Sequence, residues 1–356
     1  MTISGASYPT APALLARFDR ECRGLGLRAQ SAAELAAWRG ELRARLRSIT
    51  GIDTMRPCPL DPQADAPEPC DGYIRTRVVI GVEPEVRMPL YALTPPDLRR
   101  GEQRPVVLAL HGHASAGKAA VAGRADIPEV AQTIAQHNYA YGVQLVRAGF
   151  VVLCPDARGF GERREPMTLD DGDLLGGSCR VLNNMALPLG QTITGMWIWD
   201  LMRLIDYAET RADCDTGRLG CAGLSGGGLQ SLWLAALDER VRCAVVSGYF
   251  YGYKDALLRL SQNCSCNYVP GLWQLADMGD LGALIAPRPL LVETGRRDRL
   301  NGERGVANVT EQLAITRRAY TLLGGEDRLA HSVFDGEHRW DGAAALPWLA
   351  RWLEAP

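Results

Sequence analysis

The chain has 356 residues, 47% of them hydrophobic and 22% charged, and its formal net charge is −2. These values are ordinary for a globular protein with one large core. The nearly balanced charge argues against a nucleic-acid-binding surface, and no apolar run approaches the roughly 18 residues that a transmembrane helix requires. We therefore expect neither a nucleic-acid nor a membrane partner.

The first part of the chain is predicted to be helical, over residues 13–50. Ser31 and Glu34 have the spacing of a capping box. Apolar residues then recur at helical intervals at Leu35, Trp38, Leu42 and Leu46, and Gly51 is expected to end the helix. We interpret residues 1–56 as an N-terminal helical extension packed on a main domain of residues 57–356.

The cellular location is inferred from the N-terminus and the cysteines. The segment Met1–Pro12 lacks the basic region and leucine-rich core of a secretory signal peptide. The ten cysteines are scattered singly, and several fall in predicted strands, where a free cysteine behaves as a small buried hydrophobe. Because disulfides are rare in the cytosol, we expect a reduced, cytoplasmic protein. The oligomeric state stays open, with a homo-oligomer as one option.

The main domain is predicted to begin with an antiparallel strand pair, 73–82 and 86–93, after a proline-rich connection over 57–69. Continuous apolar runs, typical of parallel strands buried on both faces, then occur at 106–110, 150–154, 241–246 and 289–292, and a last strand is expected at 330–334. Helical stretches lie between or after them, at 132–147, 194–207, 227–237, 303–323 and 342–354. This alternation predicts a doubly wound, mostly parallel α/β sheet.

Two connections are longer than simple crossovers, 156–191 and 247–286. Long connections in a compact domain are usually functional. Both leave the carboxyl ends of predicted strands, where open α/β sheets bind ligands. We interpret them as lid-forming insertions that wall and cover a substrate pocket.

The most informative motif is Gly223-Leu224-Ser225-Gly226-Gly227, between a predicted strand at 218–222 and a helix. G-x-S-x-G in this context is a nucleophile elbow, in which the serine oxygen is exposed at the top of the sheet. The turn is so sharp that only residues without a β-carbon fit at Gly223 and Gly227. The alternative is a glycine-rich turn with a spectator serine.

A serine nucleophile requires a base, and the base requires an acid to orient it. Of five histidines, only His331 and His338 follow Ser225. His338 lies in the loop after the last strand and is the predicted base, with His331 in reserve; the alternative for His338 is a surface histidine. Asp298, in the loop after strand 289–292, is the predicted acid in preference to Glu293, unless it only pairs with a neighbouring arginine.

The oxyanion of a tetrahedral intermediate needs two fixed N–H donors. We expect the amide of Gly226 to be one, and the amide of His113, or else of Gly112, to be the other. The sequence His-x-His could instead hold zinc together with Cys264 and Cys266, but zinc needs three or four convergent ligands and these cysteines do not form a CxxC motif. We predict no metal and no cofactor.

Four residues are candidates for the substrate pocket. Tyr249 and Tyr251 follow the strand at 241–246 and could line it, although core packing is an equal alternative. Leu224 precedes the predicted nucleophile. Arg158 could clamp a substrate carboxylate, but a solvated or salt-bridged position is the stronger alternative.

Taken together, these features resemble the dienelactone-hydrolase and acetyl-xylan-esterase-like branch of the α/β-hydrolase superfamily over about residues 70–356. The resemblance rests on 110–113 (Leu-His-Gly-His), 156–163 (Asp-Ala-Arg-Gly-Phe-Gly-Glu-Arg), 223–228, 286–291, Asp298 and 336–340 (Gly-Glu-His-Arg-Trp). It implies that residues 57–356 form an α/β-hydrolase catalytic domain with a Ser225–Asp298–His338 triad. The helical extension and the segment 263–272 depart from the family pattern. Since polysaccharide esterases are commonly exported, a polymer substrate is not expected.

The predicted function is therefore that of a serine hydrolase that cleaves a small carboxylic ester or lactone through an acyl-enzyme on Ser225. Two alternatives stay open. The same triad could serve a thioesterase or acyltransferase of a biosynthetic pathway, or the fold could survive in a non-catalytic ligand-binding protein.

Overall fold

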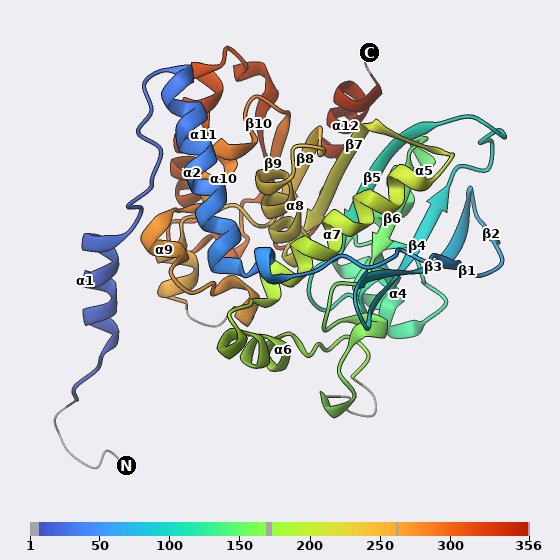
Figure 1. Ribbon diagram of the computed structural model, residues 1–356, viewed down its shortest axis with the longest axis horizontal. Coiled ribbons are helices and arrows are strands. Elements are labelled where there is room, and N and C mark those ends of the chain that lie inside the picture. The colour runs from blue at the N-terminus through green and yellow to red at the C-terminus, as the bar shows by residue number, and fades with distance from the viewer. Residues whose placement is uncertain (1–6, 169–172, 261–262, 355–356) are drawn as a thin grey trace.

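The computed structural model describes residues 7–168, 173–260 and 263–354, and in them the apolar runs form the centre of one ten-stranded sheet (Figure 1). The strands are β1 (Gln63–Ala64), β2 (Glu68–Cys70), β3 (Tyr73–Glu83), β4 (Val86–Thr94), β5 (Arg104–Leu110), β6 (Val151–Pro155), β7 (Cys214–Leu224), β8 (Cys243–Ser247), β9 (Leu290–Gly295) and β10 (Leu329–Phe334). Their order is β1-β3-β4-β6-β5-β7-β8-β9-β10, with β2 paired to β3.

The sheet is parallel from β6 to β10, and β4 joins it antiparallel through β6. Strands β3 and β4 form the predicted antiparallel pair, and the short strands β1 and β2 add to β3 within a stretch predicted as a connection. Because parallel strands share one carboxyl edge, the loops after β5, β7, β8, β9 and β10 all open on the same side of the molecule. The predicted doubly wound α/β sheet is confirmed.

Helices cover both faces of the sheet (Figure 1). They are α1 (Ala11–Glu21), α2 (Ala32–Thr50), α3 (Lys118–Val121), α4 (Pro128–His137), α5 (Tyr141–Arg147), α6 (Cys179–Ala186), α7 (Ile193–Thr210), α8 (Gly226–Leu237), α9 (Leu272–Leu275), α10 (Met278–Ile285), α11 (Val306–Leu322) and α12 (Ala345–Glu354). Helix α8 packs on β7 and β8 from one face, and α12 packs on β7, β8 and β9 from the other. Trp233 of α8 and Leu349 of α12 belong to separate apolar clusters, as expected when both faces of a sheet are buried.

The N-terminal region, predicted as helical over 13–50, contains two helices, α1 and α2. The chain between them includes Arg23 at a φ of 54°, and the Arg23 guanidinium donates to Asp280 of α10 at 2.8 Å. Ser31 accepts from the Glu34 amide at 3.2 Å, but the Glu34 carboxylate accepts from Gln30 and not from Ser31. Only half of the predicted capping box is therefore formed.

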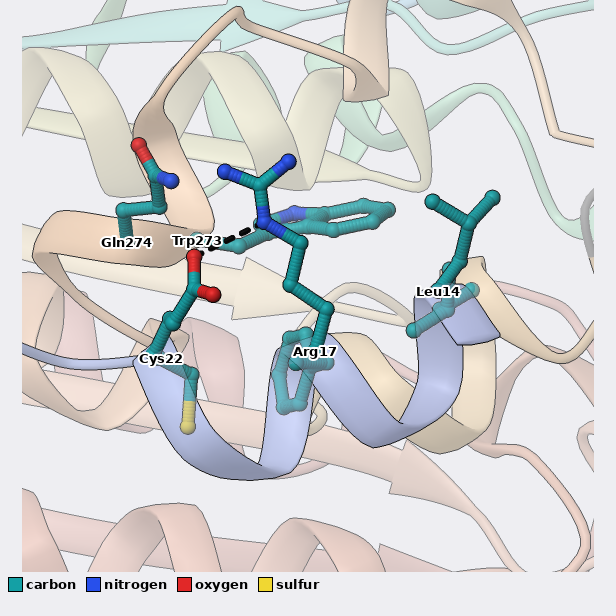
Figure 2. A pocket seen from close by; sticks show the side chains of 8 residues that line it. Leu14, Arg17, Cys22, Trp273 and Gln274 are labelled. Carbon is teal, nitrogen blue, oxygen red and sulfur yellow. Dashed lines mark hydrogen bonds and ion pairs between the residues drawn. The ribbon is translucent and has the colours of Figure 1, made fainter. Parts of the chain in front are cut away.

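Helix α2 packs on α7 and α8, and its buried leucines at 35, 42 and 46 join the same apolar cluster as the sheet. Helix α1 lies at the side of the molecule against α9 (Figure 1). Phe18 meets Trp273 edge to face at 6.0 Å, beside a small cavity of about 200 Å³ (Figure 2). The division of the chain at residue 56 stays a prediction.

The stretch predicted as one helix over 132–147 is two helices, α4 and α5, because Asn138 has a left-handed conformation with a φ of 53°. The helical pattern runs through this break, so periodicity alone could not locate it. The two long connections are partly helical and contain α6, α9 and α10.

Parts of three segments interpreted from the sequence lie outside the described residues: 1–6 of the N-terminal segment Met1–Pro12, and 169–172 and 261–262 of the two lid-forming insertions. None of the helices in the described part of the chain has both the length and the apolar character needed to cross a membrane.

Candidate active site

The predicted nucleophile, Ser225, lies between the end of β7 and the start of α8. Its backbone has a φ of 61° and a ψ of −117°, a conformation that is costly for any residue with a side chain and is concentrated at functional sites. The Ser225 amide donates to the carbonyl of Ser247, at the end of β8, at 2.9 Å. The strained turn is thus tied to the neighbouring strand.

The glycines of the turn are required by close backbone contacts. A β-carbon at Gly223 would lie 2.4 Å from the carbonyl carbon of Gly227, and one at Gly227 would lie 1.8 Å from the carbonyl oxygen of Leu110. Neither neighbour is a flexible side chain that could move aside. The predicted requirement for glycine at both positions is confirmed.

The predicted acid and base are in contact. His338 Nδ1 lies 2.7 Å from Asp298 Oδ2, and the Asp298 side chain is only 2% exposed whereas that of His338 is 27% exposed. The second carboxylate oxygen of Asp298 accepts from the Leu300 amide at 2.9 Å. With Nδ1–H donating to a buried carboxylate, Nε2 is the nitrogen left to accept a proton.

His338 and Ser225 line the same cavity. Gly248, just after β8, lies against the His338 ring: its φ is 58°, and a β-carbon there would lie 3.0 Å from His338 Cε1 and 3.0 Å from Leu224 Cδ1. Among the polar contacts of the described residues there is no hydrogen bond between Ser225 and His338. Such bonds are often long in unliganded enzymes and tighten when substrate binds.

The loop that carries His338 is fastened to the break between α4 and α5. His137 Nδ1 lies 2.9 Å from the His338 carbonyl oxygen, to which it donates, and the Trp340 amide donates to the His137 carbonyl at 3.0 Å. Asn138 Nδ2 donates to the Trp340 carbonyl at 3.1 Å. Sequence reasoning missed these positioning residues, because their role depends on a helix break that the pattern does not mark.

The predicted oxyanion loop, 111–114, lies directly over the start of α8. A β-carbon at Gly226 would lie 2.9 Å from the His113 ring, and one at Gly112 would lie 3.1 Å from Ser225 Cβ. Tyr139 donates its hydroxyl hydrogen to the His113 carbonyl at 2.8 Å. The three residues predicted to supply oxyanion donors are therefore neighbours of the Ser225 side chain.

One polar side chain in the apolar helix α8 joins the loop and the elbow. Gln230 Nε2 donates to the His111 carbonyl at 2.9 Å and to the Gly226 carbonyl at 3.1 Å. Its residue is 2% exposed. A single glutamine in an otherwise apolar helix could have indicated a buried hydrogen-bonding role for Gln230, but this role was not predicted from the sequence.

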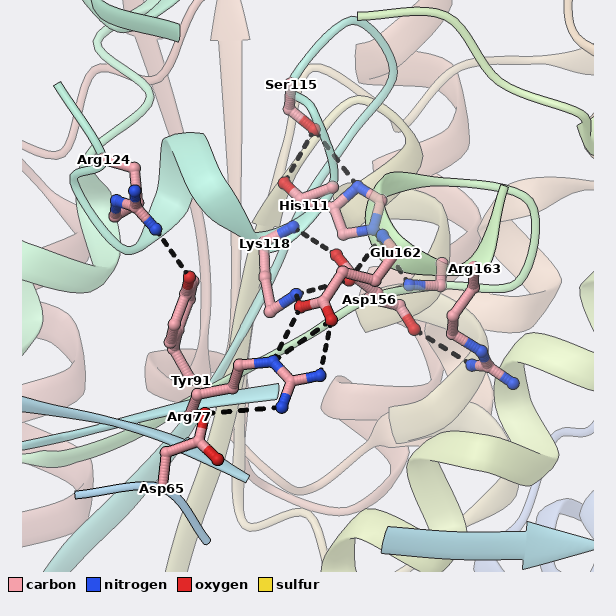
Figure 3. Close-up of polar contacts among 12 residues, drawn as sticks. Asp65, Arg77, Tyr91, His111, Ser115, Lys118, Arg124, Asp156, Glu162 and Arg163 are labelled. Carbon is pink, nitrogen blue, oxygen red and sulfur yellow. Dashed lines mark hydrogen bonds and ion pairs between the residues drawn. The ribbon is translucent and has the colours of Figure 1, made fainter. Parts of the chain in front are cut away.

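The other end of the loop is held by a buried polar network (Figure 3). Asp156 accepts from the Lys118 amide at 2.7 Å and from its ammonium at 2.6 Å. His111 Nε2 accepts from the Ala157 amide at 3.0 Å, so Nδ1 carries the hydrogen and donates to the Gly112 carbonyl at 2.8 Å. Burial lowers the pKa of His111, so this histidine is a neutral structural residue.

The cavity at Ser225 has a volume of about 380 Å³. Its described lining is His113, Ala114, His137, Tyr139, Ser225, Gly226, Leu229, Tyr249, Tyr251, Asn263, Cys264, Asn267, Leu300 and His338. Of the four predicted pocket residues, the structure places Tyr249 and Tyr251 here. Burial raises the pKa of both phenols, which therefore stay protonated.

Arg158 and Leu224 are absent from this described lining, so their assignment to the pocket was wrong. Arg158 is turned into the protein, where it donates to Asp200 of α7 at 2.9 and 2.7 Å and to Glu83 of β3 at 2.6 Å. A guanidinium held by two carboxylates is not free to clamp a substrate. Leu224 is fully buried in the core.

The two reserve residues are placed elsewhere. His331 lies within β10, with Nε2 3.0 Å from Thr294 Oγ1, and borders a different cavity beside α11. Glu293 lies within β9, where its Oε1 accepts from the Gly342 amide at 3.2 Å. Its Oε2 is buried without a hydrogen-bond partner in the described structure, and burial raises the pKa of Glu293 to about 7.

This carboxyl group predicts a pH-dependent stability. Its pKa is higher in the folded chain than the ordinary 4.5, so its contribution is complete below about pH 4.5 and is lost as the pH rises through about 7. The variant E293Q cannot ionise. The free energy of unfolding of both proteins is measured with urea from pH 5 to 8.5. As the pH rises, the value for E293Q is expected to increase relative to that of the natural protein by up to about 3 kcal/mol. A parallel pH profile for both proteins would refute this.

No family model matches the chain. A Bacillus subtilis (strain 168) protein with the name "Putative hydrolase YtaP" is 30% identical over 211 residues, which span 59% of this chain and 65% of that protein.

Solved structures match over nearly the whole chain. A "putative acetyl xylan esterase" from Bacteroides fragilis has a TM-score of 0.74 at 17% identity, covering 94% of this chain and 84% of its own. A glucuronoyl esterase from Solibacter usitatus has a TM-score of 0.66 at 17% identity, covering 93% and 97%. These likenesses show the α/β-hydrolase fold that the sequence resemblance implied.

Proposed function

We propose that this protein is a serine hydrolase that cleaves a small carboxylic ester or lactone, with Ser225 as nucleophile, His338 as base and Asp298 as orienting acid. The observation that carries the proposal is the Asp298–His338 hydrogen bond of 2.7 Å at the edge of the cavity that Ser225 also lines. A strained elbow serine and a partly exposed imidazole that line one cavity, with a buried carboxylate bonded to the imidazole from behind, are the parts that acyl transfer needs.

In the proposed reaction, His338 Nε2 takes the Ser225 hydroxyl proton as the oxygen attacks the ester carbonyl carbon. The carbonyl π electrons move to oxygen, and the amides of Gly226 and His113, or Gly112, stabilise that oxyanion. Its collapse breaks the bond to the alcohol, which leaves with the proton from His338. Water then attacks the acyl-enzyme while His338 takes one of its protons. The bond between the acyl carbon and Ser225 Oγ breaks, His338 returns the proton to that oxygen, and the acid is released.

The size and lining of the cavity favour a small acyl group. About 380 Å³ lies at the low end of the range for ligand pockets. The names of the structural neighbours, an acetyl xylan esterase and a glucuronoyl esterase, associate this fold with esters of sugars. We therefore propose a short acyl ester of a small polyhydroxylated alcohol, or the corresponding lactone, as the substrate class.

The proposal is tested by fluorophosphonate labelling with peptide mapping, followed by turnover of acetyl, butyryl, octanoyl, lactone and thioester substrates. We expect label on Ser225 and turnover that decreases with acyl length. Faster transfer to added alcohols or amines than to water would instead assign an acyltransferase. If the folded protein takes no label and turns over no substrate of the panel, the hydrolase proposal is wrong and a non-catalytic ligand-binding protein is favoured. The cytoplasmic location stays a prediction.

Gln230 provides a prediction about positioning. In Q230L the carbonyls of His111 and Gly226 lose their shared donor, so the oxyanion loop is no longer fastened to the elbow. A loop misplaced by about 1 Å lowers kcat by about 10- to 100-fold, with a smaller change in KM. Steady-state kinetics on a short ester measures the changes in kcat and KM separately. An unchanged kcat in folded Q230L would show that the Gln230 side chain only fills space.

A further inference from the structure

One wall of the cavity contains a cluster of metal-ligating side chains from three separate parts of the chain. His113 comes from the loop after β5, Cys179 begins α6, and Cys264 and Cys266 lie in the connection after β8. The ligand atoms of His113, Cys264 and Cys266 all lie within 4.8 Å of one another. Cys179 is not one of this group of three, but it lies beside it, with its sulfur 3.8 Å from the Oγ of Ser265, the residue between the two cysteines.

The spacing fits tetrahedral coordination. Zinc bonds of about 2.3 Å to sulfur and about 2.0–2.1 Å to nitrogen, at a tetrahedral angle, separate a nitrogen from a sulfur ligand by about 3.6 Å. Cys266 Sγ lies 3.5 Å from His113 Nε2. Two thiols and one imidazole nitrogen thus already lie together, and the thiol of the neighbouring Cys179 would complete a Cys₃His set, which is a standard structural zinc set.

The surroundings hold these ligands in place. The two cysteines flank Ser265 in a 3₁₀ turn, closed by the Asn267 amide donating to the Cys264 carbonyl at 3.0 Å. Asn267 Nδ2 lies 3.6 Å from Cys266 Sγ, where it can donate to a thiolate. Phe160 packs edge to face on the His113 ring at 5.4 Å. Supporting hydrogen bonds and an apolar shell of this kind orient the ligands of metal sites.

We propose that this protein binds one Zn²⁺ through Cys264, Cys266 and His113, and that Cys179, which lies beside them, turns its thiol to the ion as the fourth ligand. Binding replaces the three thiol protons, which leave to solvent, and leaves the His113 imidazole neutral, so the bound unit carries one net negative charge. Because all four positions are filled by the protein, the ion is structural and activates no water. No metal was predicted from the sequence, because zinc needs three or four convergent ligands and two cysteines one residue apart do not form a CxxC motif.

An ion at this position would also hold together the segments that form one wall of the cavity. His113 would coordinate zinc through Nε2, while its ring lies against Gly226. The ion would join the oxyanion loop to α6 and to the segment 263–267, which carries Cys264 and Asn267 of the cavity lining. Removal of zinc is therefore expected to loosen the wall of the cavity without removing any group of the proposed triad.

The test is the metal content of the full chain, purified without a histidine tag or chelator and measured by inductively coupled plasma mass spectrometry. We expect one zinc per chain, retained in S225A and in the cysteine control C58S, and lost in C264S/C266S. After zinc removal, Co²⁺ is expected to give the thiolate charge-transfer and tetrahedral d–d absorption bands in the natural chain only. Thermal unfolding with and without Zn²⁺ is expected to shift only where the cluster is intact.

Two outcomes would overturn the proposal. One is a folded, zinc-grown protein that contains no zinc and gives no tetrahedral Co²⁺ spectrum, with peptide mapping that finds free thiols or a disulfide among Cys179, Cys264 and Cys266. The other is a C58S variant that loses as much zinc as C264S/C266S does, because the zinc content would then not depend specifically on the proposed ligands. Neither readout depends on ester turnover, so the metal site and the proposed hydrolase function succeed or fail separately.

Discussion

Replacing Ser225 by alanine is expected to lower ester turnover by at least about 10⁴-fold, since the variant keeps the cavity but has no oxygen to form the acyl-enzyme. The fold should be unaffected, because the Ser225 contact to β8 uses its backbone amide. Turnover of a short-chain ester and fluorophosphonate labelling measure the effect together, with circular dichroism to establish that the variant is folded.

Ser231 provides the matched control. It lies in the same helix, α8, and is fully buried, and its hydroxyl has no hydrogen-bond partner in the described structure. S231A is expected to retain full turnover and full labelling. If S225A retained more than a few per cent of the natural turnover, another nucleophile would act and the proposed mechanism would be wrong.

Replacing Gly227 by alanine is expected to have the largest effect on stability. The added methyl would lie 1.8 Å from the carbonyl oxygen of Leu110, so α8 or β5 would have to move. Overpacking of a tight interior typically costs about 1–3 kcal/mol. Here both partners are backbone in the central sheet and its covering helix, so we expect at least about 4 kcal/mol or no folded protein. Urea unfolding followed by circular dichroism measures the loss.

Gly40, on the exposed face of α2, is the control for this substitution. A β-carbon at Gly40 would meet nothing within 4 Å. Because alanine favours helix over glycine, G40A is expected to stabilise the protein by about 0.5–1 kcal/mol. A G227A protein with the natural free energy of unfolding would mean that the elbow is not as tight as the Gly227–Leu110 contact indicates.

The acid and base candidates could be selected from the sequence because parallel strands share an edge. Asp298 and His338 each follow a predicted strand, so their loops had to open on the side where Ser225 lies, and the structure joins the two by a hydrogen bond. The same reasoning separates them from Glu293 and His331, which are still within strands. Chain order and strand ends were sufficient for this part of the site.

Pocket residues could not be assigned in the same way, since a loop position does not determine where a side chain turns. Arg158 follows β6 as expected, but Asp200 and Glu83, from α7 and β3, hold it inside the protein. His137 and Tyr139 reach the cavity only because the chain breaks at Asn138. Each of these outcomes depends on partners that are distant in the sequence.

Local chemistry and strand order were enough to predict the buried parallel strands, the elbow glycines and the order of Ser225, Asp298 and His338. Which distant side chains meet depended on how the folded chain packs. The fold brought His113, Cys264 and Cys266 together, with Cys179 beside them at Ser265. The packing of the two long connections over the sheet edge is set by many weak contacts, and these leave no periodic or spaced pattern in the chain.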